Sequence, residues 1–184
     1  MATVTRSPGL LGPYLRRRRV AAAQPLMEGR VLDVGCNRGV LCEVVPPDRY
    51  LGVDINREAL AEAQRQYPNH RFAHVDDVGP DEQFDSVVSL AVIEHVPEPE
   101  AWLSRWGAHV VPGGRVILTT PTPRWEPLHG LASKLRLTSE SAHDAHVSVL
   151  DRAGLEAVLA VAGLELTHYS RFLAGMNQLV VATR

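Results

Sequence analysis

The chain has 184 residues, enough for one domain that buries about 70% of the surface exposed by its unfolded form. Its net charge of −2 and pI near 6.4 argue against a binder of bulk polyanions such as nucleic acid. No stretch approaches the roughly 18 apolar residues of a membrane helix, so we expect no membrane association. The two cysteines, Cys36 and Cys42, are expected to be unpaired thiols in a cytoplasmic protein.

The amino-terminal segment is basic. Before Glu28 there is no acidic residue, whereas Arg6 and the run Arg16 to Arg19 supply five positive charges. We expect a helix near residues 14–27, with its arginines solvated and its apolar side chains packed on a sheet. An arm that contacts RNA and an organelle transit peptide are the alternatives that the charge leaves open.

A glycine-rich turn follows the first predicted strand. Residues 31–34 suit a buried strand, the turn runs from Gly35 to Gly39, and the apolar residues 40–45 are a candidate helix. The order strand, glycine turn, helix is how α/β proteins build a nucleotide site, because glycine lets the backbone approach the ligand. A dinucleotide-binding fingerprint would need glycines at positions 37 and 40, which hold Asn37 and Val40. A P-loop would need a Gly-Lys-Ser/Thr ending, which is absent.

Two further predicted strands end in acids. Residues 50–55 read as a strand that ends in Asp54, which follows Gly35 by the spacing of a carboxylate that binds a ribose diol. The alternative for Asp54 is a cap of the next helix. Residues 71–77 read as a third strand, which ends in Asp76 and Asp77.

The middle of the chain carries a continuous apolar block. Residues 84–96 suit a strand buried on both faces of a parallel sheet. Pro97 and Pro99 then end the strand and open a helix, whose Trp102 and Trp106 are expected to pack in the core. A Pro-Gly-Gly turn at residues 112–114 precedes a fifth strand that runs to Pro121.

A long segment, residues 122–148, interrupts the regular pattern. Loops of this length in a compact domain are usually functional, and this one contains His143, His146, Glu140 and Asp144. These side chains could ligate a metal, but no second ligand pair with clear spacing accompanies them, so we expect none. A helix then begins with Ser148 as its cap and stops at Gly163, and strands are predicted at residues 164–172 and 177–183.

Together these blocks resemble the class I S-adenosylmethionine-dependent methyltransferases. The turn D-x-G-x-x-x-G is similar to motif I of that family, with Asn37 in place of the middle glycine, and Glu94-His95-Val96 resembles the end of the fourth strand in its small-molecule members. The resemblance covers about residues 15–184. It implies a Rossmann-like α/β sandwich whose mostly parallel, seven-stranded sheet ends in an antiparallel hairpin. We expect one domain, residues 1–184, with residues 1–27 as a helical cover and 122–148 as a lid on the acceptor site.

The resemblance also implies a reaction. The expected function is transfer of a methyl group from S-adenosylmethionine to a small-molecule oxygen or nitrogen by in-line displacement, which releases S-adenosylhomocysteine. His95 is the first candidate base, followed by His143 and His146, although His95 could instead support the site structurally. The family implies these cofactor-binding residues: Asp33, Gly35, Cys36, Asn37, Gly39, Asp54, Ile55, Asp76, Asp77 and Leu90. An RNA methyltransferase that uses the arginine run and a non-catalytic cofactor-binding protein are the alternatives. A monomer or homodimer is expected.

Overall fold

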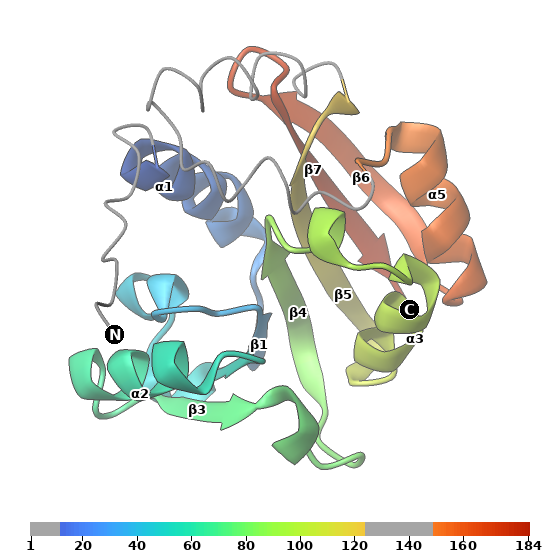
Figure 1. Cartoon of the computed structure of the whole chain (residues 1–184). Coiled ribbons are helices and arrows are strands. Elements are labelled where there is room, and N and C mark those ends of the chain that lie inside the picture. Colours follow the sequence, from blue (N-terminus) through green and yellow to red (C-terminus); the bar gives the residue numbers. More distant parts are fainter. Residues whose placement is uncertain (1–11, 124–148) are drawn as a thin grey trace.

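The computed structural model describes residues 12–123 and 149–184, which form one mixed sheet flanked by helices (Figure 1). The strands lie in the order β3-β2-β1-β4-β5-β7-β6, in which β1 to β5 are parallel and β7 is antiparallel to both of its neighbours. Their bounds are β1 (Val31–Val34), β2 (Tyr50–Asp54), β3 (Arg71–His74), β4 (Phe84–Leu90), β5 (Val110–Pro121), β6 (Glu165–Phe172) and β7 (Asn177–Thr183). The predicted Rossmann-like sheet with an antiparallel hairpin is confirmed.

Helices cover both faces of the sheet. The α-helices are α1 (Gly12–Ala23), α2 (Arg57–Gln66), α3 (Pro99–Gly107) and α5 (Arg152–Val161). Short 3-10 turns are η1 (Gln24–Leu26), η2 (Val40–Glu43), η3 (Pro47–Arg49), η4 (Val75–Asp77) and η5 (Ile93–His95). Helices α3 and α5 lie side by side on one face, whereas α1 covers the other (Figure 1). No helix in these described stretches is long and apolar enough to cross a membrane.

Strand alternation divides the core into two layers. Leu32 and Val34 of β1 pack with the buried side chains of α3 and α5. Val31, on the opposite face of the same strand, packs with Val20 and Ala23 of α1. Because successive strand side chains point to opposite faces, the two layers fix how α1 and α3 are placed over the sheet.

The helix expected at residues 40–45 is only the 3-10 turn η2. Val44 leaves the helical backbone, with φ of −129° and ψ of −14°. Pro46 and Pro47 follow it, and proline disfavours a helical residue before it and cannot donate a helical hydrogen bond. The third strand is also shorter than expected, since the backbone turns into η4 after His74.

The start of the last helix differs from the prediction as well. Asp151 is the cap of α5, and its Oδ1 accepts a hydrogen bond of 2.9 Å from the N–H of Gly154. Ser148, predicted as the cap, lies outside the described residues. Gly163 adopts a φ of +71° just after the helix, as expected for a helix stop.

Candidate active site

A cleft of about 760 Å³ opens at the carboxyl ends of the parallel strands, where α/β proteins bind ligands. Its volume falls in the usual range of small-molecule sites. Helix α1 contributes Arg16 and Arg19 to its lining, and α3 contributes Trp102, Arg105 and Trp106. The strand ends and the turns after them contribute Asp33 to Asn37 at β1, Asp54 and Ile55 at β2, Val75 at β3, and Leu90 to Val92 with His95 at β4.

The turn after β1 is left-handed at three positions. Gly35, Asn37 and Gly39 have φ of +78°, +48° and +76°. Asn37 thus adopts the conformation for which glycine is usually required, as its residue type allows. A Cβ built on Gly35 would lie 2.5 Å from Cγ2 of Val92, so the missing side chain lets Val92 pack closely against the turn. The N–H groups of Gly35 and Cys36 donate to the carbonyl of Val53, which ties the turn to β2.

Asp54 joins the end of β2 to that turn. Its Oδ2 accepts a hydrogen bond from the N–H of Asn37 and its Oδ1 accepts one from the N–H of Asn56, both 2.8 Å long. Asn56, not Asp54, caps α2, because its side chain accepts from the N–H groups of Glu58 and Ala59. Each carboxylate oxygen of Asp54 keeps a further acceptor site for a ligand in the cleft.

Asp33 is a buried acid at the wall of the cleft. Only 3% of the residue is exposed, and Tyr50 donates a hydrogen bond of 2.8 Å from its hydroxyl to Oδ2. Burial raises the pKa of Asp33 to about 7, while the hydrogen bond from Tyr50 lowers it. A cationic ligand nearby would favour the charged form of Asp33.

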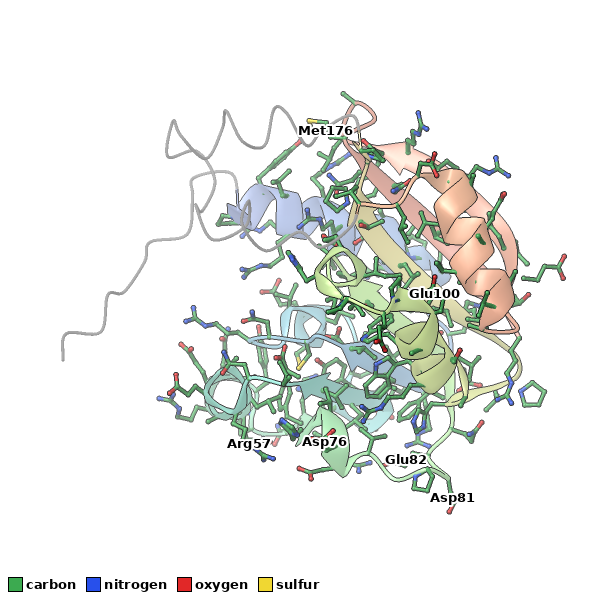
Figure 2. The ribbon with its side chains drawn as sticks, turned by 45° about the vertical axis from the view of Figure 1, so that its right-hand side comes forward. Arg57, Asp76, Asp81, Glu82, Glu100 and Met176 are labelled. Atoms are coloured by element: carbon green, nitrogen blue, oxygen red, sulfur yellow. The ribbon has the colours of Figure 1, made fainter. Side chains whose placement is uncertain are left out.

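The acids after β3 are not part of the cleft lining. Asp76 has a side chain that is 70% exposed, and its Oδ1 lies 3.7 Å from Nη2 of Arg105. Asp77 lies 3.9 Å from Arg57. Figure 2 labels Arg57 and Asp76 at the same end of the molecule. Val75, just before these acids, lines the cleft, whereas neither carboxylate is part of the lining.

The segment after β4 places one acid behind the cleft and one imidazole in it. Glu94 is 2% exposed and accepts a hydrogen bond of 3.0 Å from Oγ1 of Thr120. Burial raises the pKa of Glu94, while the charges of Arg19 and His95 lower it. His95 is exposed and lines the cleft. The other two candidate bases, His143 and His146, lie outside the described residues.

The expectation that all the arginines of α1 are solvated is wrong for Arg19. Arg17 and Arg18 are exposed, but Arg16 and Arg19 line the cleft. Nε of Arg19 donates a hydrogen bond of 3.0 Å to Oδ1 of Asn177, and burial lowers the pKa of Arg19. Arg19 is partly buried at the cleft, whereas Arg16 lines the cleft and is also exposed.

Helix α3 contributes cleft residues that the sequence did not reveal. Trp106 is buried and both tryptophans pack with the core, as predicted, yet Trp102 and Trp106 also line the cleft. The guanidinium of Arg105 lies 4.7 Å from the ring centroid of Trp106 and donates a hydrogen bond to the carbonyl of Val75. The helical spacing of the apolar residues in α3 predicted that one face of the helix is buried. It could not predict that part of this face lines the cleft, because that depends on how α3 packs against the ends of the strands.

Comparisons with known proteins identify the family of the chain. A family model described as a methyltransferase domain matches residues 11–169. The ubiquinone biosynthesis O-methyltransferase of Bradyrhizobium diazoefficiens is 31% identical over 105 residues, which cover 53% of this chain and 42% of that protein. The ubiquinone biosynthesis O-methyltransferase of Rhodopseudomonas palustris strain TIE-1 is 32% identical over 117 residues, which cover 59% of this chain and 46% of that protein. The chain thus matches less than half of the length of these curated relatives.

Solved structures share the fold at low sequence identity. An S-adenosylmethionine-dependent methyltransferase from Mesorhizobium loti has a TM-score of 0.67 over 96% of this chain and 98% of its own, at 19% identity. The chain belongs to the methyltransferase-domain family. The cofactor of this family is S-adenosylmethionine, and the residues present fit it: a glycine turn without a side chain at Gly35 and a carboxylate with acceptor sites at Asp54.

Proposed function

We propose that this chain transfers a methyl group from S-adenosylmethionine to an oxygen or nitrogen of a small molecule. The observation that carries the proposal is the junction of Asp54 with the left-handed turn from Gly35 to Gly39, inside a cleft of nucleotide size. The bound cofactor supplies a methyl group already activated by a sulfonium centre. The protein must then hold the acceptor atom in line behind that methyl group and exclude water.

The cofactor roles follow the order of the strand ends. We assign Asp33, Gly35, Cys36, Asn37 and Gly39 to the methionine end, Asp54 to the ribose, Ile55 and Leu90 to the adenine faces, and Asp76, with Asp77 as the alternative, to the adenine amino group. Ile55 supports its assignment because it is 77% exposed at the cleft, a position where an apolar side chain gains from covering a flat base. Oδ1 of Asp76 lies 3.7 Å from Nη2 of Arg105, a residue that lines the cleft.

Proton removal falls to His95 in this proposal. An acceptor hydroxyl or ammonium must lose its proton, and a base near it needs a pKa close to the working pH, which imidazole has. His95 lines the cleft at the end of β4, near Glu94. His143 and His146 remain alternative bases in the segment that we propose covers the acceptor site.

A small-molecule acceptor is supported by the names of similar proteins. The two curated relatives are named for ubiquinone biosynthesis. Magnesium protoporphyrin IX methyltransferase from Synechocystis PCC 6803, solved with S-adenosylhomocysteine, has a TM-score of 0.64 at 20% identity, over 94% of this chain and 82% of its own. Arg16 and Arg19 line the cleft, and this position supports a small-molecule acceptor rather than RNA.

Isothermal titration calorimetry with S-adenosylhomocysteine tests the proposal, with NADH as the control ligand. We expect micromolar binding of S-adenosylhomocysteine at one site per chain and none of NADH, because no second and third fingerprint glycines are present to receive a dinucleotide. Folded protein that binds NADH but not S-adenosylhomocysteine would overturn the proposed function.

A further inference from the structure

One face of α1 presents a line of positive charge to the cleft. Gly12, Arg16 and Arg19 have the spacing i, i+4, i+7, which places them on one side of a helix, and all three line the cleft. A helix that merely covered an apolar site would present apolar side chains here.

Arg19 is anchored on the half of the sheet that lies away from Asp54. Its partner Asn177 is 2% exposed and begins β7, where it pairs with Pro121 at the carboxyl end of β5. Four strand spacings separate β2 from β7 in the sheet, about 19 Å at the usual distance between strands. Met176, next to Asn177, and Asp76, after β3, lie far apart in Figure 2. Arg19 therefore belongs to the acceptor half of the cleft.

The charge of this half is unmatched by the cofactor. S-adenosylmethionine carries a carboxylate together with an ammonium and a sulfonium, so its net charge cannot neutralise two guanidinium groups. Glu94 faces Arg19 from behind the cleft and is not part of its lining. A guanidinium at a partly desolvated wall gains most from a carboxylate, which matches its planar pair of donors.

We propose that the methyl acceptor carries a carboxylate and that Arg19 binds it, with Asn177 holding the guanidinium in place. This inference rests on the proposed function and names the chemical class of its acceptor. The carboxylate lies against α1, so the methylated atom lies between Arg19 and the methyl group, near His95. Arg19 is thus a determinant of acceptor specificity and takes no part in proton transfer.

Calorimetry on the protein saturated with S-adenosylhomocysteine tests the inference with three matched pairs of probes. The pairs are benzoate and benzamide, phenylacetate and phenylacetamide, and 3,4-dihydroxybenzoate and 3,4-dihydroxybenzamide. In each pair the shape is nearly constant, while the amide removes the negative charge and replaces one acceptor oxygen by an NH2 donor. We expect at least one acid to bind wild type at least tenfold more tightly than its amide.

Variants of α1 assign that preference to one side chain. Arg19→Met should remove the preference for the acid, and Arg19→Lys should retain part of it, because lysine keeps the charge but not the bidentate geometry. Arg17→Met is the matched control: it removes the same charge from the same helix, at an exposed position outside the cleft lining. Affinity for S-adenosylhomocysteine, measured on each variant, should stay within twofold and shows that the site is folded.

Two results would overturn the inference while leaving the cofactor assignment intact. The first is that no acid binds better than its amide to protein that binds S-adenosylhomocysteine. The second is a preference for the acid that survives in Arg19→Met. Failure of wild type to bind S-adenosylhomocysteine would instead overturn the proposed function and, with it, this inference.

Discussion

Oδ2 of Asp54 accepts a hydrogen bond of 2.8 Å from the N–H of Asn37, which links the end of β2 to the left-handed turn after β1. The bond makes the proposed ribose anchor and the proposed methionine site one structural unit. Asn37 supplies both the left-handed backbone and the donor, so its replacement of the usual glycine leaves this unit complete.

Asp54→Asn should weaken binding of S-adenosylhomocysteine by about 10- to 100-fold, because hydrogen bonds to a charged acceptor contribute about 1.5–3 kcal/mol. Calorimetric titration measures the change. Asp48→Asn is the control, since Asp48 is an exposed acid on η3 and does not line the cleft. An affinity of Asp54→Asn within twofold of wild type would contradict the ribose assignment.

Gly35→Ala should lower the free energy of unfolding by about 2–4 kcal/mol, because the new Cβ meets Val92 and the residue has a positive φ. Two control variants separate the contact with Val92 from the positive φ, with the free energy of unfolding measured by urea denaturation. Gly113→Ala, with a φ of +79° and open space, should cost about 1–2 kcal/mol, and Gly79→Ala, with neither feature, should not destabilise the protein. Equal losses at Gly35 and Gly113 would exclude the contact with Val92 as a cause.

Asp33 should make the stability of the ligand-free protein depend on pH. The folded protein keeps the Asp33 proton up to a pKa of about 7, whereas the unfolded chain loses it near 3.8. The stabilising contribution of this proton is therefore full below about pH 4 and is lost as pH rises through 7. Its upper bound is about 4 kcal/mol.

Comparison with Asp33→Asn isolates this effect from other titrating groups. Between pH 4 and 8, the free energy of unfolding of wild type should fall relative to that of the variant, as measured by urea denaturation at each pH. Tyr50→Phe should move the midpoint of the fall upward, because the hydrogen bond from Tyr50 lowers the pKa of Asp33. A difference between wild type and Asp33→Asn that is independent of pH would contradict the buried-acid account.

Paired variants of Asp76 and Asp77 should identify the adenine contact. Asp76→Ala is expected to weaken binding of S-adenosylhomocysteine by several-fold, about 1 kcal/mol for one lost hydrogen bond. Asp77→Ala should leave the affinity unchanged, because the adenine amino group is assigned to Asp76. If calorimetry shows that Asp77→Ala weakens binding of S-adenosylhomocysteine and Asp76→Ala does not, Asp77 is the residue that contacts the adenine amino group.

The sequence predicted those parts of the site that depend on local backbone chemistry. The glycine turn at Gly35 and the acid-ended strand at Asp54 each carry their own signal, because a left-handed turn and a strand end restrict the residue types that fit. Apolar runs and turns predicted where the strands lie, whereas the mostly parallel order and the final antiparallel hairpin were implied by the resemblance to the class I methyltransferases.

The parts that the sequence missed depend on tertiary packing. Four consecutive arginines occupy every side of a helix, so only the packing of Val20 and Ala23 on the sheet decides that Arg19 faces the cleft. The direction of Asp76 is likewise set by Arg105 on α3, which is distant in the chain. Local signals could not reveal either contact.

A crystal structure of the complex with S-adenosylhomocysteine would test the central claim most directly. We predict that the ribose hydroxyls donate to Asp54, that the homocysteine lies along the turn at Gly35, and that the sulfur faces the side of the cleft lined by His95 and Arg19. A cofactor bound with its ribose away from Asp54, or with its sulfur facing away from α1, would contradict the proposed methyl transfer in this cleft.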